Sequence, residues 1–390
     1  MSQFTAKQTE LSPTEKRAML AQLLQEKTVF PETSSPYSTS FQGMNFSFIY
    51  FAGNEAELGD RKYQLLLEGA KFADRHRFTA IWLPERHFHP FGGLYPSPSV
   101  LCSALAMVTE RIRLRAGSVV MPLNSPLRVA EQWAIIDNLS GGRVDLAFAR
   151  GWNANDFVLN PAAYENNRDA LFTGIEQVQK LWRGESILVP NGVGDEVEIR
   201  TYPAPVQAEL PVWVTCSGGK ERFVEAGAAG AHVLTALLFQ EIEELEEKIA
   251  LYRAARADNG YDPQSGQVTL MLHTFIEDDL TTVRDRVRQP FMNYLRTSVN
   301  LWSRGKKNVS ELSDRERDKL VEYAFERYFQ TNALFGTPES VRPTIQRLHD
   351  IGINEIACLL DFGVEVESVL ASLDSLNRLR EQCVPAKTHS

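Results

Sequence analysis

The chain contains few cysteines and no long apolar run. These two absences exclude disulfide-rich secreted proteins and proteins with membrane-spanning helices. Four of its 390 residues are cysteine and none forms a CxxC pair, so we expect reduced, mostly buried thiols and neither a disulfide framework nor a zinc ribbon. No apolar run approaches the roughly 18 residues that a membrane-spanning helix needs. The N-terminus also lacks the basic and then apolar order of a secretory signal. These absences predict a cytoplasmic protein with no membrane partner.

Basic charge is also in short supply, which argues against nucleic acid as a partner. The net charge is −9 and the lysines and arginines are dispersed along the chain. No GxGxxG motif is present, so no dinucleotide site is implied. The composition, 43% hydrophobic and 23% charged, is that of an ordinary globular protein.

Strand-like and helix-like segments alternate from Met44 onward. The strand-like runs are almost continuously apolar, as in a parallel sheet that is covered on both sides. We expect strands at Phe46–Phe51, Thr79–Leu83, Ile112–Met121, Arg143–Ala149, Pro211–Thr215, His232–Thr235, Val268–Phe275 and Glu355–Leu360. Helices are expected between them, for example at Arg61–Arg75, Pro126–Leu139, Asn167–Trp182 and Lys220–Ala229. Eight strand–helix units predict an α/β fold of the (β/α)8 or TIM-barrel type.

Three segments depart from this alternation. Residues 186–203 indicate a small hairpin, and residues 278–332 form a long, charged, mostly helical insertion that could cover an active site as a lid. Residues 1–43 precede the barrel and contain an amphipathic helix signal at Leu11–Lys27. That helix could pack on the body or dock a partner protein. The predicted domains are therefore 1–43 and a barrel at 44–390.

Reactive side chains follow the predicted second strand. Glu85, Arg86, His87 and His89 come directly after it, at the end of the barrel where enzymes of this fold place their chemistry. A histidine with a pKa of about 6.5 suits acid–base catalysis. A structural ion pair of Glu85 with Arg86 or with Arg150 would explain the same residues without catalysis.

Two further strand ends have the composition of an anion site. Arg150 and Gly151 close the fourth strand, where a guanidinium can clamp a phosphate and a glycine lets the backbone approach it. Residues Ser217 to Lys220, read Ser-Gly-Gly-Lys, follow another strand and open a helix whose free amides could bind an anion. A salt bridge at the barrel rim and a plain strand–helix turn are the structural alternatives.

Four motifs in register resemble the bacterial luciferase-like flavin monooxygenases, over about Met44 to Arg378. They are PERHFHPFG (84–92), the run from GSVVMPL to GWNANDF (117–157), VWVTCSGGKERFVEAGAAG (212–230) and FGTPESV (335–341). The stretches ERHFHPFGG, LRAGSVVMPL, VTLMLHTF and INEIACLLDFG are most similar to the branch found in nonribosomal peptide and polyketide assembly lines. LSPTEKRAMLAQLLQEK resembles the linker helix that follows carrier domains there.

The resemblance implies a function and a set of site residues. A two-component monooxygenase of this kind receives reduced FMN from a separate flavin reductase and uses O2 as cosubstrate. The implied substrate is an acyl or aminoacyl group on a carrier protein in natural-product biosynthesis, with residues 11–27 contacting the carrier. A homodimer formed through helices near the first strands is also implied.

Individual residues take their implied roles from the same resemblance. The FMN phosphate would bind Arg150, Gly151, Ser217, Gly218, Gly219 and Lys220. Gly117 and Ser118 occupy the position of a non-proline cis peptide beneath the flavin ring. His87 is the implied catalytic base, with Glu85 orienting it or Arg86. Arg86 itself stands where the family has the first histidine of its Glu-His-His segment, which makes light emission doubtful.

Three other functions stay open at this point. A metal-dependent barrel hydrolase could use His87 and His89 together with His232, His273 and Asp361, although the pair follows the second strand and not the first. A barrel that binds flavin or a carrier without turnover is a second alternative. A deazaflavin-dependent oxidoreductase of the same fold is a third. His273, Asn153, Asp156 and Trp152 could also reach the pocket, whereas His232 is expected at the opposite, structural face.

Overall fold

The computed structural model describes residues 43–51, 53, 61–237, 240–303 and 314–383. The predicted helix Leu11–Lys27 and most of the predicted domain 1–43 lie outside this part of the chain. The predicted division of the chain into a domain at 1–43 and a barrel at 44–390 therefore remains a prediction.

Within the described residues, eight parallel strands close into a barrel, as the sequence predicts. In spatial order they run from β11 through β1, β2, β3, β4, β7, β8 and β9, and β9 pairs again with β11. Their bounds are β1 (Asn45–Ile49), β2 (Ala80–Leu83), β3 (Arg113–Val120), β4 (Val144–Ala149), β7 (Val212–Thr215), β8 (His232–Ala236), β9 (Val268–Ile276) and β11 (Glu355–Leu359). All eight overlap the predicted strands.

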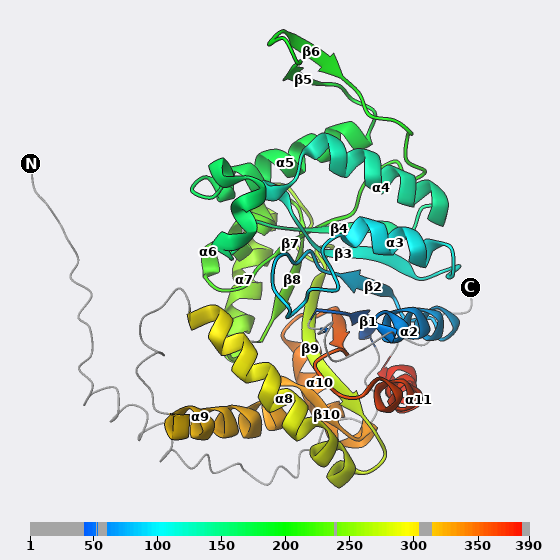
Figure 1. Cartoon of the computed structure of the whole chain (residues 1–390), viewed down its shortest axis with the longest axis vertical. Helices are drawn as coiled ribbons and strands as arrows, with labels where there is room; N and C mark the ends of the chain where they lie inside the picture. Colours follow the sequence, from blue (N-terminus) through cyan, green and yellow to red (C-terminus); the bar gives the residue numbers. More distant parts are fainter. Residues whose placement is uncertain (1–42, 52, 54–60, 238–239, 304–313, 384–390) are drawn as a thin grey trace, which may run out of the picture.

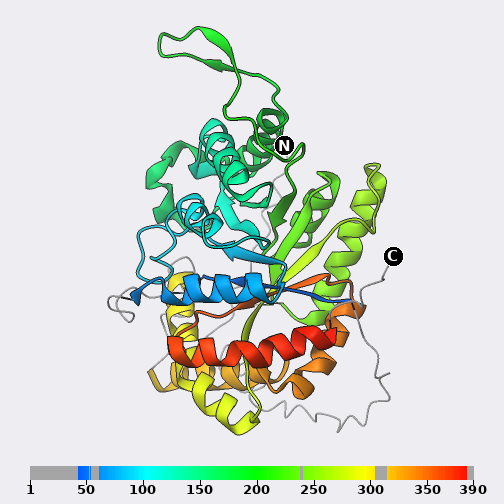
Figure 2. The same cartoon turned by 90° about the vertical axis from the view of Figure 1, so that its right-hand side faces the viewer.

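Helices cover the outside of this barrel (Figures 1 and 2). They are α2 (Gln64–Arg75), α3 (Pro98–Ala106), α4 (Pro126–Ser140), α5 (Asn167–Trp182), α6 (Lys220–Ala228), α7 (Ile242–Asp258), α10 (Pro338–Asp350) and α11 (Val366–Cys383). Proline stands in the first turn of α3, α4 and α10, where its missing N–H costs nothing. None of the described helices combines the length and the apolarity that a bilayer-spanning helix requires.

Both predicted interruptions of the barrel are present. The strands β5 (Ile187–Pro190) and β6 (Glu196–Ile199) form an antiparallel hairpin that projects at the top of Figure 1. The late insertion is helical and consists of α8 (Leu280–Ser303), α9 (Asp314–Arg327) and the π-helical turn η6 (Tyr328–Asn332). It leads into β10 (Leu334–Gly336), which adds to β9 in parallel. The lid role of this insertion remains a prediction.

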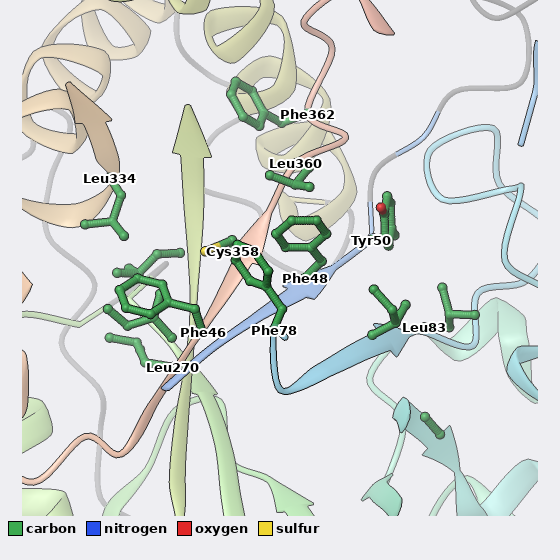
Figure 3. Close-up of a cluster of buried hydrophobic side chains, with 14 of the residues drawn as sticks. Phe46, Phe48, Tyr50, Phe78, Leu83, Leu270, Leu334, Cys358, Leu360 and Phe362 are labelled. Carbon is green, nitrogen blue, oxygen red and sulfur yellow. The ribbon is translucent and has the colours of Figure 1, made fainter. Parts of the chain in front are cut away.

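Alternating side chains of the strands build two separate apolar layers. On β1, Phe46 and Phe48 point outward, and Phe48 lies 4.5 Å from the ring of Phe78 in the cluster that also contains Cys358 (Figure 3). Ile49 points into the barrel instead, because neighbouring strand residues face opposite sides. All four cysteines are buried and free.

The N-terminal half of the barrel interior is filled by a buried ion cluster. The Arg115 guanidinium binds Asp145 at 2.6 Å and Glu355 at 2.9 Å, and it lies against the ring of Trp82 at 4.7 Å. A buried cation needs such partners because its desolvation is costly. His232 lies at this end, as predicted, and accepts a hydrogen bond from the amide of Gln267. Because this ion cluster fills the N-terminal half of the barrel interior, a ligand-binding site is expected at the C-terminal end.

Candidate active site

Glu85 links the ends of two neighbouring strands and holds His87. Its carboxylate accepts hydrogen bonds from the amide of Val120 at 2.7 Å and from Asn124 Nδ2 at 3.0 Å. The same carboxylate lies 3.0 Å from His87 Nε2. Because three groups bind Glu85, its position and that of the imidazole are fixed. The alternative ion pairs of Glu85 with Arg86 or Arg150 do not form.

A non-proline cis peptide joins Gly117 and Ser118 in the C-terminal half of β3. The strand register against β4 shifts between Gly117 and Val119, so the chain bulges at this point. The Ser118 hydroxyl hydrogen-bonds the Thr215 hydroxyl on β7, across the mouth of the barrel. A Cβ on Gly117 would lie 3.1 Å from the Cβ of Trp82, so the backbone passes close over that side chain. The cis peptide is the one that the resemblance implied.

Two arginines meet beside the turn that opens α6. Arg150 follows β4, and Arg222 in the first turn of α6 donates from Nη1 to the Ser217 carbonyl at 2.8 Å. Burial and then the charge of Arg150 lower the pKa of Arg222. Neither guanidinium forms an ion pair with any described residue. Gly218 has φ +115° with open space above it, so the turn is accessible. Helix N-termini with adjacent cations favour anions, so this turn is a candidate anion site.

Lys220 does not bring its side chain to this turn. Its ammonium is exposed and pairs with Glu247 on α7 at 2.7 Å, so only its backbone lies at the start of the helix. Arg222 supplies the second cation instead, and the sequence reasoning missed it. A cation in the first turn of a helix opposes the helix dipole, and that unfavourable position is the signal that could have identified it.

Arg86 extends across the mouth of the barrel into a cage of aromatic rings. Its guanidinium carbon lies 5.0 Å from the ring centre of Phe51, 5.7 Å from that of Phe91 and 5.3 Å from that of Trp152. Asp156 also reaches this region and accepts a hydrogen bond from Asn153 Nδ2 at 2.7 Å. Burial raises the pKa of Asp156, although the charges of Arg86 and His87 act in the opposite direction.

His273 lies deeper, beneath α8. Its ring is 4.8 Å from Phe291 and 4.5 Å from Tyr294, and its Nε2 has no hydrogen-bond partner among the described residues. Burial lowers the pKa of His273 to about 3, so the ring is neutral. His232 is at the far end of the barrel from His87. The histidines that a metal-dependent hydrolase would need are therefore not brought together.

Comparison with known proteins places these features in a family. Residues 44–355 match the sequence profile of the luciferase-like monooxygenases. The chain belongs to that family. The oxygenase component of a flavin-dependent trigonelline monooxygenase from Acinetobacter baylyi is 26% identical over 344 residues, which are 84% of this chain and 91% of that protein. This luciferase-like protein is accordingly a flavin-dependent monooxygenase.

Solved structures agree on the fold. The oxygenating constituent of 3,6-diketocamphane monooxygenase from Pseudomonas putida, solved in complex with FMN, superposes with a TM-score of 0.72 at 16% identity and covers 89% of this chain and 100% of its own. An F420-dependent secondary alcohol dehydrogenase has a TM-score of 0.64 at 16% identity and covers 88% and 100% of the two chains. At these identities the likeness concerns the barrel and not the reaction.

Proposed function

We propose that this luciferase-like protein binds reduced FMN and uses O2 to oxygenate an organic substrate, as the oxygenase component of a two-component system. The observation that carries the proposal is the pair of unpaired guanidinium groups, Arg150 and Arg222, beside the turn Ser217–Gly219. The trigonelline relative is named as an oxygenase component, which supports a separate flavin reductase as the partner of this protein too.

The phosphate of FMN fits this turn in charge and in hydrogen-bonding capacity. A phosphate near pH 7 carries close to two negative charges and offers several acceptor oxygens. Arg150 and Arg222 would neutralise it, and the backbone of Gly218, Gly219 and Lys220 at the start of α6 would donate to it. The Lys220 side chain is left out of the proposed site because Glu247 holds it elsewhere.

The remaining site residues suit the reaction of a bound flavin. Reduced flavin supplies the electrons that activate O2. The cis peptide at Gly117–Ser118 would lie under its ring. His87 would transfer a proton at Nδ1, because Glu85 holds the other ring nitrogen, Nε2. The aromatic rings of Phe51, Phe91 and Trp152 would exclude water from the mouth. Arg86 belongs to the same reaction region.

The substrate proposal rests on the resemblance to assembly-line enzymes. On that basis the substrate is an acyl or aminoacyl group held by a carrier protein, which residues 11–27 would contact during natural-product biosynthesis. A deazaflavin-dependent oxidoreductase is the second candidate, because the F420-dependent dehydrogenase shares the fold. Comparing the affinities for reduced FMN and for reduced F420 separates the two.

An exposed apolar face supports a homodimer. Val100 is 66% and Met107 69% exposed on and just after α3, and Ile135 and Leu139 on α4 are about half exposed. Exposed apolar side chains on two neighbouring helices are typical of a protein interface. The helices α3 and α4 follow the second and third barrel strands, as the implied dimer requires.

One anaerobic titration followed by mixing with oxygen tests the flavin proposal. Wild type should bind reduced FMN, and Arg150→Ala or Arg222→Ala should weaken binding at least tenfold because each removes a charge-assisted contact with phosphate. His87→Ala should bind reduced FMN normally and reoxidise it with oxygen, yet form little oxygenated product. Lys220→Ala is the matched control and should bind as wild type does. Equal affinity of Arg150→Ala and wild type would remove the phosphate assignment.

A further inference from the structure

Among the described residues, Arg86 differs from the other buried arginines because its guanidinium has no polar partner. Five arginines are at most 9% exposed within the described chain, namely Arg86, Arg115, Arg143, Arg256 and Arg380. The guanidinium groups of the other four all donate hydrogen bonds, for example Arg115 to Asp145 and Glu355, and Arg143 to the Ile112 carbonyl. The Arg86 guanidinium forms neither a hydrogen bond nor an ion pair with a described residue.

Arg86 is nevertheless held firmly in one place. Its backbone amide donates to the Tyr95 carbonyl at 2.9 Å, and its side chain passes beneath Gly92, where an added Cβ would lie only 3.0 Å from its Cγ. The rings of Phe51, Phe91 and Trp152 enclose the head group. These rings come from the loops after three different strands, β1, β2 and β4, so the guanidinium lies over the mouth of the barrel.

The charged groups near Arg86 do not neutralise its guanidinium. Burial lowers the pKa of Arg86, and the groups that oppose the shift are Asp156 and Tyr294. Asp156 forms no ion pair with Arg86, and it accepts a hydrogen bond from Asn153 instead. Arg86 follows β2, whereas Arg150 follows β4 and Arg222 lies in the first turn of α6, so Arg86 and the phosphate turn are on different loops.

A caged and unpaired guanidinium is complete only with an anion. Cation–π contacts repay part of its desolvation, but its five N–H donors still need acceptors. A carboxylate matches the planar fork of the guanidinium with two parallel hydrogen bonds. The surroundings add a preference for an apolar or flat body, because Phe91 contacts Tyr294 at 5.3 Å and Tyr294 contacts His273.

We propose that Arg86 binds a carboxylate of the substrate, so that the substrate is an organic acid with an aromatic or apolar body. The acid group can belong to a free molecule or to the far end of a tethered acyl chain. This inference rests on the proposed function in treating the bound acid as the molecule that is oxygenated. Arg86 then fixes the substrate over the mouth of the barrel. Arg86 follows β2 and Arg150 follows β4, so the substrate carboxylate and the flavin phosphate would bind at different arginines.

Calorimetric titration of the flavin-loaded protein with small acids tests the assignment. The probes are benzoate, hexanoate and acetate at fixed ionic strength, with benzamide as the uncharged counterpart of benzoate. Wild type should bind benzoate or hexanoate more tightly than acetate, and it should not bind benzamide. Arg86→Met fills similar space without the charge and should weaken acid binding at least tenfold. Arg86→Lys keeps the charge without the fork and should weaken it severalfold.

Melting temperatures and control variants distinguish a ligand-binding role of Arg86 from a structural one. Arg86→Met should melt at or above the temperature of wild type, because it removes an uncompensated buried charge, whereas loss of one partner from the Arg115 cluster in Asp145→Asn should lower the melting temperature. Lys220→Met removes an exposed cation that pairs with Glu247 and lies outside both proposed sites, and it should keep its affinity for benzoate. If Arg86→Met does not fold, the titration of Arg86→Lys decides.

Two results would overturn the assignment. One is that none of the three acids binds to wild type, and the other is that Arg86 variants bind them as tightly as wild type does. A loss of reduced-FMN affinity in Arg86→Met, without any acid binding to wild type, would show that Arg86 faces the flavin ring instead. Failure of the flavin proposal looks different, because reduced FMN would not bind while the flavin-free protein would still bind benzoate in an Arg86-dependent way.

Discussion

Burial determines the protonation of individual histidines in this protein. The His273 ring is 3% exposed and is surrounded by aromatic side chains, so the cost of desolvating an imidazolium lowers its pKa from 6.5 to about 3. His232 follows the same rule with a pKa of about 4, because it is largely buried and faces Arg256 and Arg115. Both histidines are neutral in the folded chain at pH 7. Unfolding exposes them to water.

The first prediction concerns the acid stability that follows from His273. Between pH 6.5 and 3 the unfolded chain binds a proton at this residue and the folded chain does not, so stability falls as the pH is lowered through that window. The slope from this one group is about 1.4 kcal/mol per pH unit. Between pH 6.5 and 5, the free energy of unfolding of His273→Phe should therefore fall by about 2 kcal/mol less than that of wild type.

Denaturant unfolding of both proteins at several pH values measures this difference. His232 is present in both, so its own contribution cancels. Parallel curves for the two proteins across pH 6.5 to 5 would mean that His273 is hydrated or paired in the fold.

At the scale of elements, the insertion α8 is attached by aromatic packing more than by charge. Phe291 is fully buried and its ring contacts those of His273, Tyr328, Phe335 and Phe362. Between α8 and α9, in contrast, Arg288 pairs with Glu322 and Glu326 while its side chain is 39% exposed. Exposed ion pairs contribute little because water screens them.

The second prediction compares these two kinds of contact. Phe291→Ala should lower the free energy of unfolding by about 3–5 kcal/mol, as large-to-small changes in an aromatic core do. Arg288→Ala should lower it by less than about 1 kcal/mol. Urea denaturation followed by circular dichroism measures both. A larger effect of Arg288→Ala than of Phe291→Ala would show that charge holds α8 in place.

At the scale of the whole molecule, part of the exposed apolar surface lies on the neighbouring helices α3 and α4. The hairpin β5–β6 projects on its own side of the barrel (Figure 1), and Ile187 anchors it to Leu181 of α5. The helices α2 and α11 pack side by side on another face (Figure 2). The α3–α4 face carries the exposed Val100 and Met107 and is the face proposed for the homodimer.

The third prediction tests that homodimer. Met107→Asp places a charge in the proposed interface, where desolvation makes it unfavourable, and should convert a dimer to a monomer. Sedimentation velocity measures the change, and circular dichroism shows whether the fold is kept. Val193→Asp, on the exposed hairpin tip, is the matched control and should remain dimeric. A monomeric wild type, or an unchanged Met107→Asp dimer, would refute the interface.

The pattern of the chain was enough to predict most of the barrel, but not all of its site. Every barrel strand could be placed because buried parallel strands are continuously apolar, and Glu85 and His87 could be found because charge follows such a strand abruptly. Arg222 could not be found in this way, because in sequence it is one of several charged residues on an amphipathic helix. Lys220 was predicted for its position in the turn, but its pairing with Glu247 depends on where α7 packs.

The amino-acid sequence by itself determined the fold class and the family of this protein. Apolar periodicity and short motifs at strand ends are local properties, so they can be recognised in the sequence without knowing how the elements pack. Only the tertiary structure decided which polar side chains have partners. It showed Glu85 bound by His87, Val120 and Asn124. It also showed Arg86 enclosed by rings from three loops, with no acceptor for its guanidinium in the part of the chain that the structure describes. Pairing of this kind depends on distances between residues far apart in the chain, which no local pattern encodes.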